Sequence, residues 1–208
     1  MKIIKKAFLL SIVLLIICGI GYPLLMTGLS QLVFPRQAKG SIIEIGGKKV
    51  GSEVLGQSFS DARFFKGRPS AVNYNTYTEA DTKPDNEGKT AYSGVSSGSQ
   101  NLAPSNPALA ERVQKDMDAF LKANPDIRKD QLPADLLTAS GSGLDPHISP
   151  KAAQLQIPAI AKATGIGEVQ LNKIIDKYTD GKQLGIFGEP RVNVLKANLE
   201  IYKILNMR

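Results

Sequence analysis

The N-terminal part of the chain is a long apolar segment without charge. No charged residue occurs between Lys6 and Arg36, and the run AFLLSIVLLIICGIGYPLLM fills most of that interval. About 20 apolar residues suffice for a helix to cross the hydrocarbon core of a bilayer. A signal peptide has a shorter apolar region, of about 7–15 residues, and then a small-residue cleavage site, which does not follow here. The pattern therefore predicts a transmembrane helix over residues 7–33.

Basic residues beside this segment predict its orientation. Lys2, Lys5 and Lys6 precede the apolar run, and positive residues next to a span stay in the cytoplasm. Arg36 and Lys39 on the other flank weaken this signal. We expect a single-pass protein of the cell membrane, with residues 1–6 cytoplasmic and residues 34–208 outside the cytoplasm.

Small residues recur along one side of the predicted span. At 100° per residue they fall within a sector of about 100°, and small residues on one face let helices approach closely in lipid. Gly21 and Gly28 are the main candidates for contact with a partner helix. Membrane helices are rich in glycine, however, so such a face can also arise by chance. Pro23 is expected to kink the helix nearby. The predicted face contains Ala7, Ser11, Cys18, Gly21 and Gly28.

After the span, the pattern changes to short β-rich runs and then to polar sequence. Residues 42–45 and 48–55 flank Gly46-Gly47, a turn dipeptide, and together they predict a hairpin. From residue 76 to residue 98 the chain is rich in Gly, Ser, Thr, Asp and Lys, which predicts a loop.

Helical periodicity dominates the C-terminal half. Asn106-Pro107 and Ser149-Pro150 each combine an N-cap residue with proline at the first helical position. The first predicted helix carries an apolar stripe, ends before Asn124-Pro125, and uses the stripe for core packing or for binding a partner. The second contains Pro158, which is expected to break or kink it, and ends at Gly165. Two further helices are predicted over 168–178 and 194–205. A hairpin followed by helices favours an α+β domain on the single membrane helix. The stripe consists of Leu109, Val113, Met117, Phe120 and Leu121.

Composition excludes several classes of function. Cys18 is the only cysteine, so no internal disulfide and no cysteine-ligated metal site can form. The net charge of +7 includes the three N-terminal lysines, there is no Trp, and the clustered basic face typical of nucleic-acid binding is missing. No GxxxxGK[ST] phosphate loop occurs. The only histidine, His147, lies near Asp145 and two serines, but the G-x-S-x-G motif of a hydrolase nucleophile is absent.

Several segments rich in Gly, Ser, Pro and Asn interrupt the helices. In TASGSGLDPHISP, Ser140, Ser142 and Asp145 can bond nearby backbone groups, and its glycines can adopt positive φ. Such a segment is a shaped structural loop, a contact surface for a partner, or less often a small-molecule site. The residues alone leave these alternatives open.

The ordered set of motifs resembles the C-subunit family of the Kdp potassium-transporting P-type ATPase. GYPLL lies in the span and FPRQAKGSII follows it; then come FKGRPSA, GSQNLAPSNPAL, TASGSGLDPHISP and GEPRVNVLKANL. The resemblance covers nearly the whole chain. Ala103 stands where the family tends to have Gly, and the stretch from 76 to 98 is longer than usual.

The resemblance implies an accessory subunit, needed for assembly or activity of a high-affinity potassium uptake pump, and not an enzyme in its own right. Its partners would be the potassium-channel-like KdpA, the ATP-hydrolysing KdpB and the small KdpF peptide. The family has been proposed to act as a catalytic chaperone that raises the ATP affinity of the pump subunit. ATP and K⁺ would thus belong to the complex, and no cofactor or metal is expected on this chain.

The motif residues supply the predicted partner contacts, and no catalytic residue is predicted. An alternative function is a membrane-tethered extracellular binding protein, which would need a deep pocket with apolar walls and convergent polar groups. The contact candidates are Gly21, Gly28, Arg68, Ser105, Asn106, Ser140, Ser142, Asp145, His147, Glu189, Arg191 and Asn193.

Overall fold

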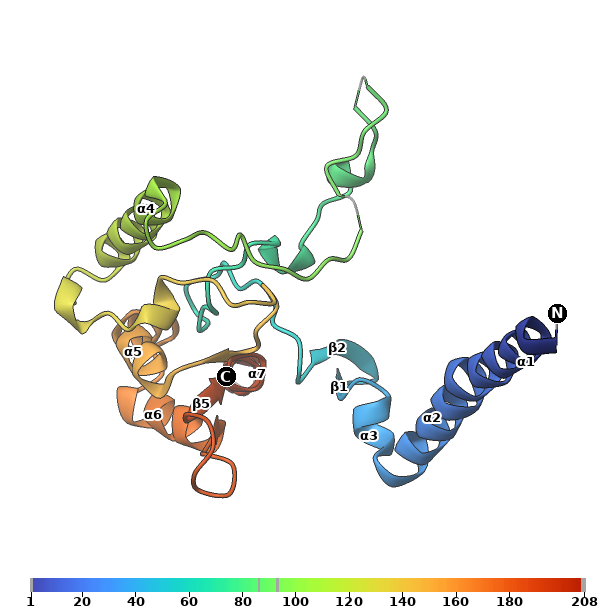
Figure 1. Ribbon diagram of the computed structural model, residues 1–208. Helices are drawn as coiled ribbons and strands as arrows, with labels where there is room; N and C mark the ends of the chain where they lie inside the picture. The colour runs from blue at the N-terminus through green and yellow to red at the C-terminus, as the bar shows by residue number, and fades with distance from the viewer. Residues whose placement is uncertain (1, 86, 93, 207–208) are drawn as a thin grey trace. The chain divides into compact units, whose positions relative to one another are not determined.

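The computed structural model describes residues 2–85, 87–92 and 94–206. Met1 of the predicted cytoplasmic segment, residues 86 and 93 of the predicted loop, and residues 207 and 208 of the predicted outer domain lie outside that description. The chain forms two compact units, one ending at Ser52 and one beginning at Glu53 (Figure 1). The predicted hairpin thus groups with the N-terminal helix.

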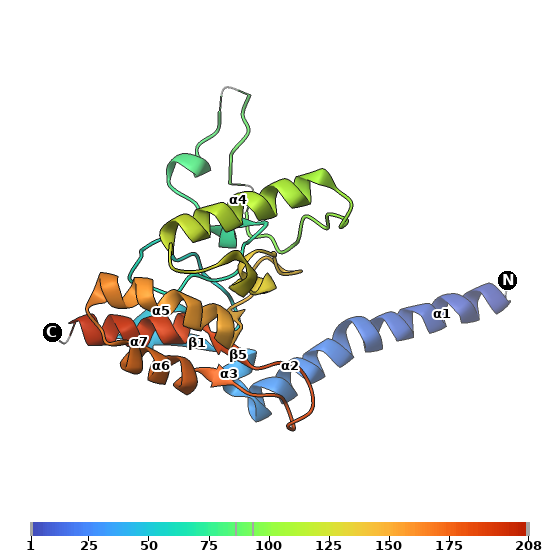
Figure 2. The ribbon, with the colours of Figure 1, turned by 90° about the vertical axis from the view of Figure 1, so that its left-hand side faces the viewer.

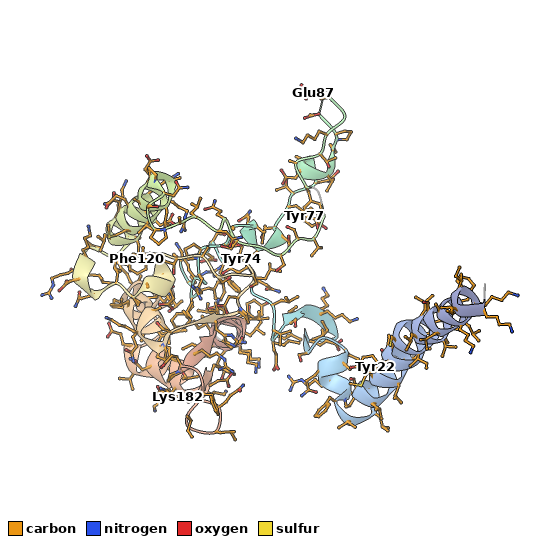
Figure 3. All side chains as sticks on the ribbon, in the orientation of Figure 1. Tyr22, Tyr74, Tyr77, Glu87, Phe120 and Lys182 are labelled. Atoms are coloured by element: carbon orange, nitrogen blue, oxygen red, sulfur yellow. The ribbon has the colours of Figure 1, made fainter. Side chains whose placement is uncertain are left out.

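The first unit is built on a 32-residue helix, Lys2–Val33, which is long and apolar enough to cross a membrane. It consists of α1 (Lys2–Ile16), a π-helical turn η1 (Ile17–Gly21) and α2 (Tyr22–Val33). Its large apolar side chains are exposed, Tyr22 among them (Figure 3). A core helix would bury such a face, so this helix needs an apolar environment that the described chain does not supply.

A short helix and the predicted hairpin complete the first unit. α3 (Pro35–Ala38) leads into β1 (Ile42–Ile45), which pairs antiparallel with β2 (Lys48–Ser52). Gly46 and Gly47 form the turn with φ of 56° and 77°, as expected for a tight hairpin. The hairpin is confirmed, although its second strand ends three residues earlier than predicted.

The π-helical turn changes which small residues share a face of the long helix. It lies directly before Pro23, whose ring cannot fit against the carbonyl four residues earlier in a regular α-helix. An i→i+5 turn holds one extra residue, so it rotates the two halves relative to each other by about 100°. Gly21 and Gly28 still share a face, but the predicted continuous face that included Ala7 and Ser11 is wrong.

The second unit combines helices with a small antiparallel sheet. β3 (His147–Ile148) and β4 (Thr179–Asp180) both pair with β5 (Arg191–Asn193). The helices are α4 (Pro107–Ala123), α5 (Pro150–Thr164), α6 (Glu168–Lys177) and α7 (Val194–Asn206). In the described parts of the connections lie the 3₁₀ turns η2 (Asn73–Asn75), η3 (Ala80–Thr82), η4 (Lys129–Gln131) and η5 (Ala134–Leu136). The mixture confirms the α+β class.

Side-chain caps fix the helix starts where the sequence predicted them. Asn106 Oδ1 accepts a hydrogen bond from the Ala108 amide, and Ser149 Oγ accepts one from the Ala152 amide, both at 3.0 Å. Gly165 ends α5 in the left-handed conformation, with φ of 70°. α5 continues through Pro158, so the expected interruption does not take the form of a break.

The hydrophobic core lies between α5, α6, α7 and the three-stranded sheet. These helices lie together, whereas α4 forms a separate layer beside α5 (Figure 2). Of the predicted stripe on α4, only Met117 is fully buried, so this helix packs against the rest of the unit through a half-buried face. The core residues are Phe65, Ile148, Ala152, Ala153, Ile157, Ile160, Ile166, Leu171, Ile174, Ile175, Val192, Val194, Ala197 and Ile201.

The predicted loop over 76–98 projects from the second unit, with Glu87 near its tip (Figure 3). Among its described residues, Tyr77 and Tyr92 stack with ring centroids 4.1 Å apart. Pro84 and Thr90 form an isolated bridge farther out. The segment is therefore a loop with a paired stem.

Candidate partner-contact site

Two buried amide side chains hold the FFKGRP segment, residues 64–69, against the core. Asn198 on α7 accepts a hydrogen bond from the Phe65 amide at 2.8 Å and donates one to the Phe65 carbonyl at 2.9 Å. Gln156 on α5 likewise accepts a hydrogen bond from the Lys66 amide at 2.8 Å and donates one to the Lys66 carbonyl at 3.2 Å. Both amides are at least 95% buried, and buried polar groups need such partners. The side-chain amides thus satisfy the backbone N–H and C=O groups of this segment, as neighbouring strands do in a sheet.

The side chains of Asn198 and Gln156, called here the amide clamp, place Arg68 beside the TASGSGLDPHISP loop. Arg68 Nη1 lies 3.2 Å from Asp145 Oδ2, and both side chains are about three-quarters buried. The guanidinium also donates to the Thr138 carbonyl at 3.3 Å from Nε and from Nη2. One arginine therefore joins two segments that lie about 70 residues apart in the sequence.

Asp145 and His147 form the other half of this cluster. The His147 amide donates to Asp145 Oδ1 at 2.9 Å, while the imidazole Nδ1 lies 3.6 Å from the same oxygen. Burial acts to raise the pKa of Asp145, but hydrogen bonding from His147 and the positive charge of Arg68 outweigh it. The pKa of Asp145 therefore lies below its usual range, and the carboxylate stays ionised near neutral pH.

Serines and glycines shape the loop before Asp145. Ser140 Oγ accepts from the Gly143 amide at 2.9 Å, and Ser142 Oγ accepts from the Leu144 amide at 3.1 Å. Ser70 then donates to the Gly143 carbonyl at 2.6 Å. The bonds of Ser140 and Ser142 are the side-chain-to-backbone bonds that the sequence predicted, whereas the Ser70 bond was not predicted.

Close backbone approaches lock the cluster further. The Tyr74 hydroxyl donates to the Arg68 carbonyl at 2.6 Å. Burial, reinforced by the Asp145 charge, raises the pKa of Tyr74 to about 12, so the phenol stays a donor. A Cβ on Gly56 would lie 2.5 Å from the Asp145 carbonyl oxygen, and one on Gly67 would lie 2.7 Å from the Tyr74 hydroxyl. Only glycine fits at these two positions without a shift of the neighbours.

The GEPRVNV motif meets the same loop through the sheet. His147 pairs with Asn193 across β3 and β5. Asn193 Oδ1 accepts from the Lys196 amide at 3.1 Å, and its Nδ2 donates to the Glu53 carbonyl at 2.8 Å. Arg191 lies 3.8 Å from Asp180. No strand was predicted in this motif, because three residues are too short for a β-pattern.

The structure brings together most, but not all, of the predicted contact residues. Arg68, Ser140, Ser142, Asp145 and His147 form one cluster, and Asn193 and Arg191 continue it along β5. Glu189 lies in the exposed β4–β5 loop, 3.5 Å from Lys182.

Four predicted contact residues lie elsewhere. Asn106 caps α4 and Ser105 beside it is exposed, whereas Gly21 and Gly28 belong to the first unit. Asn198 and Gln156 were missed. Their signal was a polar residue on the apolar face of a helix.

One cavity, of about 390 Å³, lies between the FFKGRP segment, α4 and α5. Its walls combine aromatic and aliphatic side chains with the polar groups of Lys66, Arg68 and Asp116. Arg68 and Asp116 already have partners within the chain, Asp145 and Arg112 respectively. The polar groups of the wall are therefore largely committed to the fold.

The cluster shows the geometry of a structural site, held together by hydrogen bonds and an ion pair within the chain. Within the described residues, no hydrogen bond joins His147 to Ser140 or Ser142. The same residues contain no group of three or more His, Cys, Asp or Glu that could hold a metal ion. What the cluster can do is present a rigid surface of loop backbone and charged side chains.

Comparison with known proteins adds a second kind of observation. The family described as "KdpC: K+-transporting ATPase, c chain" matches residues 4–203. The chain belongs to the KdpC family. The family resemblance inferred from the motifs is thereby confirmed, and the motif cluster is a feature of a potassium-transporting ATPase subunit.

Curated KdpC relatives match along all or nearly all of their lengths. The potassium-transporting ATPase KdpC subunit of Clostridioides difficile is 60% identical over 207 residues, covering 100% of both chains. That of Caldanaerobacter subterraneus subsp. tengcongensis is 48% identical, covering 95% of this chain and 93% of the relative. That of Rhodopseudomonas palustris is 43% identical, covering 97% and 96%.

Proposed function

We propose that this chain is a non-catalytic accessory subunit of a Kdp potassium-transporting ATPase, anchored in the cell membrane by the helix Lys2–Val33. The observation that carries the proposal is the KdpC family match over residues 4–203. The exposed apolar helix supports it, because such a helix needs lipid or partner helices around it. KdpA, KdpB and KdpF are the proposed partners.

We also propose that the second unit lies outside the cytoplasm. Lys2, Lys5 and Lys6 support this orientation through the preference of positive residues for the cytoplasmic side. The nucleotide-binding part of a P-type pump is cytoplasmic, so this unit would lie across the membrane from ATP. The proposed chaperone effect on ATP affinity would then act by contacts that shift the populations of pump states.

The motif cluster is the proposed contact surface of the second unit. Arg68 and Asp145 hold its loops rigid, so a partner would meet a preformed surface at low entropic cost. Arg191 and His147 keep about one-third and one-quarter of their side chains exposed, respectively. They are the candidates for direct contact.

Substitution of the two glycines in the helix tests the assembly role. A Cβ at Gly28 meets nothing within 4 Å, and one at Gly21 meets only the Ile16 carbonyl at 3.8 Å. Gly21→Leu and Gly28→Leu should therefore leave the helix intact. Recovery of the partner subunits with the tagged chain, and potassium-stimulated ATPase activity, should nevertheless fall by roughly tenfold through lost close packing.

Leu14→Ala, in the same helix before the π turn, serves as the matched control and should preserve recovery. Full recovery of the complex with both glycine variants would refute the proposed packing face. If the unmodified chain recovers no pump subunit, the proposed function itself fails.

The alternative of a membrane-tethered binding protein rests on the cavity beside α4. Its volume of about 390 Å³ falls within the range of ligand sites. Its committed polar groups argue for packing space under a loosely attached helix, and the accessory role remains the better-supported function.

A further inference from the structure

The loop between β4 and β5 carries a cluster of largely exposed apolar side chains. Residues 180–190 are all exposed, and the loop extends beyond α5, α6 and α7 of its own unit, with Lys182 at its base (Figures 1 and 3). The exposed fractions are 89% for Leu184, 74% for Ile186 and 63% for Phe187. Three large apolar residues within four positions are more than the scattered exposure of an ordinary surface.

The tip of this loop is ordered by its own backbone. Gln183 and Phe187 exchange two hydrogen bonds, of 2.8 and 2.9 Å, which close a turn around Leu184, Gly185 and Ile186. Leu184 adopts a φ of 53°, a left-handed conformation that is unfavourable for a bulky residue. Strained positions of this kind concentrate at functional sites. The apolar side chains are thus presented in a fixed arrangement, and little entropy remains to be lost on binding.

Charges near the tip are paired and lie at its base. Lys182 lies 3.5 Å from Glu189, and Arg191 lies 3.8 Å from Asp180. Between Lys182 and Glu189 the sequence QLGIFG contains no charged residue. The loop therefore combines a neutral apolar tip with a charged base. Each carboxylate of the base has a cationic partner, so a negatively charged surface would not be repelled by an unpaired negative charge.

The strand that bears the loop also anchors the point where the chain enters the second unit. Asn193 on β5 bonds to the Glu53 carbonyl at 2.8 Å, and Lys196 at the start of α7 lies 2.8 Å from the Glu53 carboxylate. Only the 19 residues from 34 to 52 separate Glu53 from the end of the apolar helix. Fully extended they would reach about 65 Å, and the hairpin within them shortens that reach.

We propose that the Leu184–Phe187 tip inserts into the interfacial layer of the bilayer in which the chain is anchored. The 19-residue connection limits how far the second unit can move from the bilayer that holds the helix, and this tether raises the effective concentration of lipid around the loop. Leu and Phe are among the side chains that interfacial elements bury at the headgroup boundary, and Leu is under-represented among the hot spots of protein interfaces. The inference requires the helix to be membrane-anchored, but it depends neither on orientation nor on the role in the pump.

A single-tryptophan experiment tests the insertion in the full-length chain. The natural chain has no Trp, so Phe187→Trp reports on the tip alone. In nanodiscs its emission should shift to the blue, and lipids brominated on the acyl chain should quench it at least about twofold more than unbrominated lipids, because the tip lies at the acyl boundary. Val95→Trp is the matched control, since Val95 is 82% exposed in another loop; it should stay red-shifted and unquenched.

A second variant distinguishes the apolar tip from simple proximity. Leu184→Ser and Ile186→Ser added to Phe187→Trp should reduce the quenching to the level of the control. Emission typical of water, with no more quenching than Val95→Trp, would overturn the proposal. A blue shift without bromine quenching, in the chain or in a purified complex, would also overturn it, because the tip would then be buried against protein.

Discussion

Gly143 shows how a single hydrogen atom in place of a side chain can be essential at the residue scale. Its φ of 67° is left-handed, and a Cβ there would lie 2.7 Å from the Gly98 carbonyl oxygen and 2.9 Å from Val72 Cγ2. Strain and overpacking of this kind cost about 1–2 and 1–3 kcal/mol. Gly143→Ala should therefore lower the free energy of unfolding by roughly 2–5 kcal/mol, measured by denaturant titration of the full chain in detergent.

Gly141, two positions earlier in the same loop, is the matched control. A Cβ there meets nothing within 4 Å, so Gly141→Ala should change the stability by no more than about 0.5 kcal/mol. Equal effects of the two substitutions would contradict the close packing described for Gly143.

Asp145 makes the stability of the cluster depend on pH. Its pKa is depressed in the folded chain, so its contribution is present above the unfolded pKa of about 4 and is lost as pH falls through the lower folded pKa. Asp145→Asn should cost roughly 1–2 kcal/mol at pH 7. The difference from the natural chain should shrink on acidification below about pH 4.

Asp61 provides the comparison for Asp145, since it pairs with Arg63 on the surface. Asp61→Asn should leave the denaturation midpoint at pH 7 unchanged, because exposed pairs contribute little. A constant Asp145→Asn difference from pH 7 to pH 3 would show that the carboxylate charge is not what stabilises the cluster.

At the scale of elements, α7 binds a segment that lies far from it in the sequence. Its Asn198 side chain makes hydrogen bonds to the backbone of Phe65. Asn198→Ala would leave both backbone groups of buried Phe65 without their partner. At about 1–3 kcal/mol for each of these two unsatisfied groups, the unfolding free energy should fall by roughly 2–6 kcal/mol in denaturant titration. Asn206→Ala on the same helix removes only an exposed bond to Tyr202 and should be nearly neutral. A neutral Asn198→Ala would mean that water replaces the clamp.

Elements with local signals could be predicted from the sequence, and those that depend on distant pairing could not. Asn106, Ser149 and Gly165 mark helix ends through their own chemistry, and Gly46-Gly47 marks its hairpin turn. β3 and β5 have two and three residues, and they become strands only because the fold brings them together. For the same reason, the motifs identified Arg68 and Asp145 as candidates without revealing that they pair.

At the scale of the whole molecule, the orientation of the second unit is the central expectation. Glu87→Cys in a chain with Cys18→Ser should react with a membrane-impermeant thiol reagent on intact cells, since Glu87 is exposed near the tip of its loop. Lys2→Cys in the same background should react only after lysis. Labelling would be measured by the mass shift of the chain. Reaction of Lys2→Cys on intact cells, and of Glu87→Cys only after lysis, would place residues 53–208 in the cytoplasm.

The clamp between Phe65 and Asn198 joins residues 133 positions apart, which has a consequence for how the protein is made. A ribosome delivers residue 65 long before α7 exists, so the FFKGRP segment has no partner for most of synthesis. Non-local contacts also slow folding, because a long loop must close before they form. The nascent second unit should therefore remain unfolded until α7 emerges, and it needs protection from aggregation during that time. If the unit lies outside the cytoplasm, as proposed, this delay keeps it in the unfolded state that a narrow translocation channel requires.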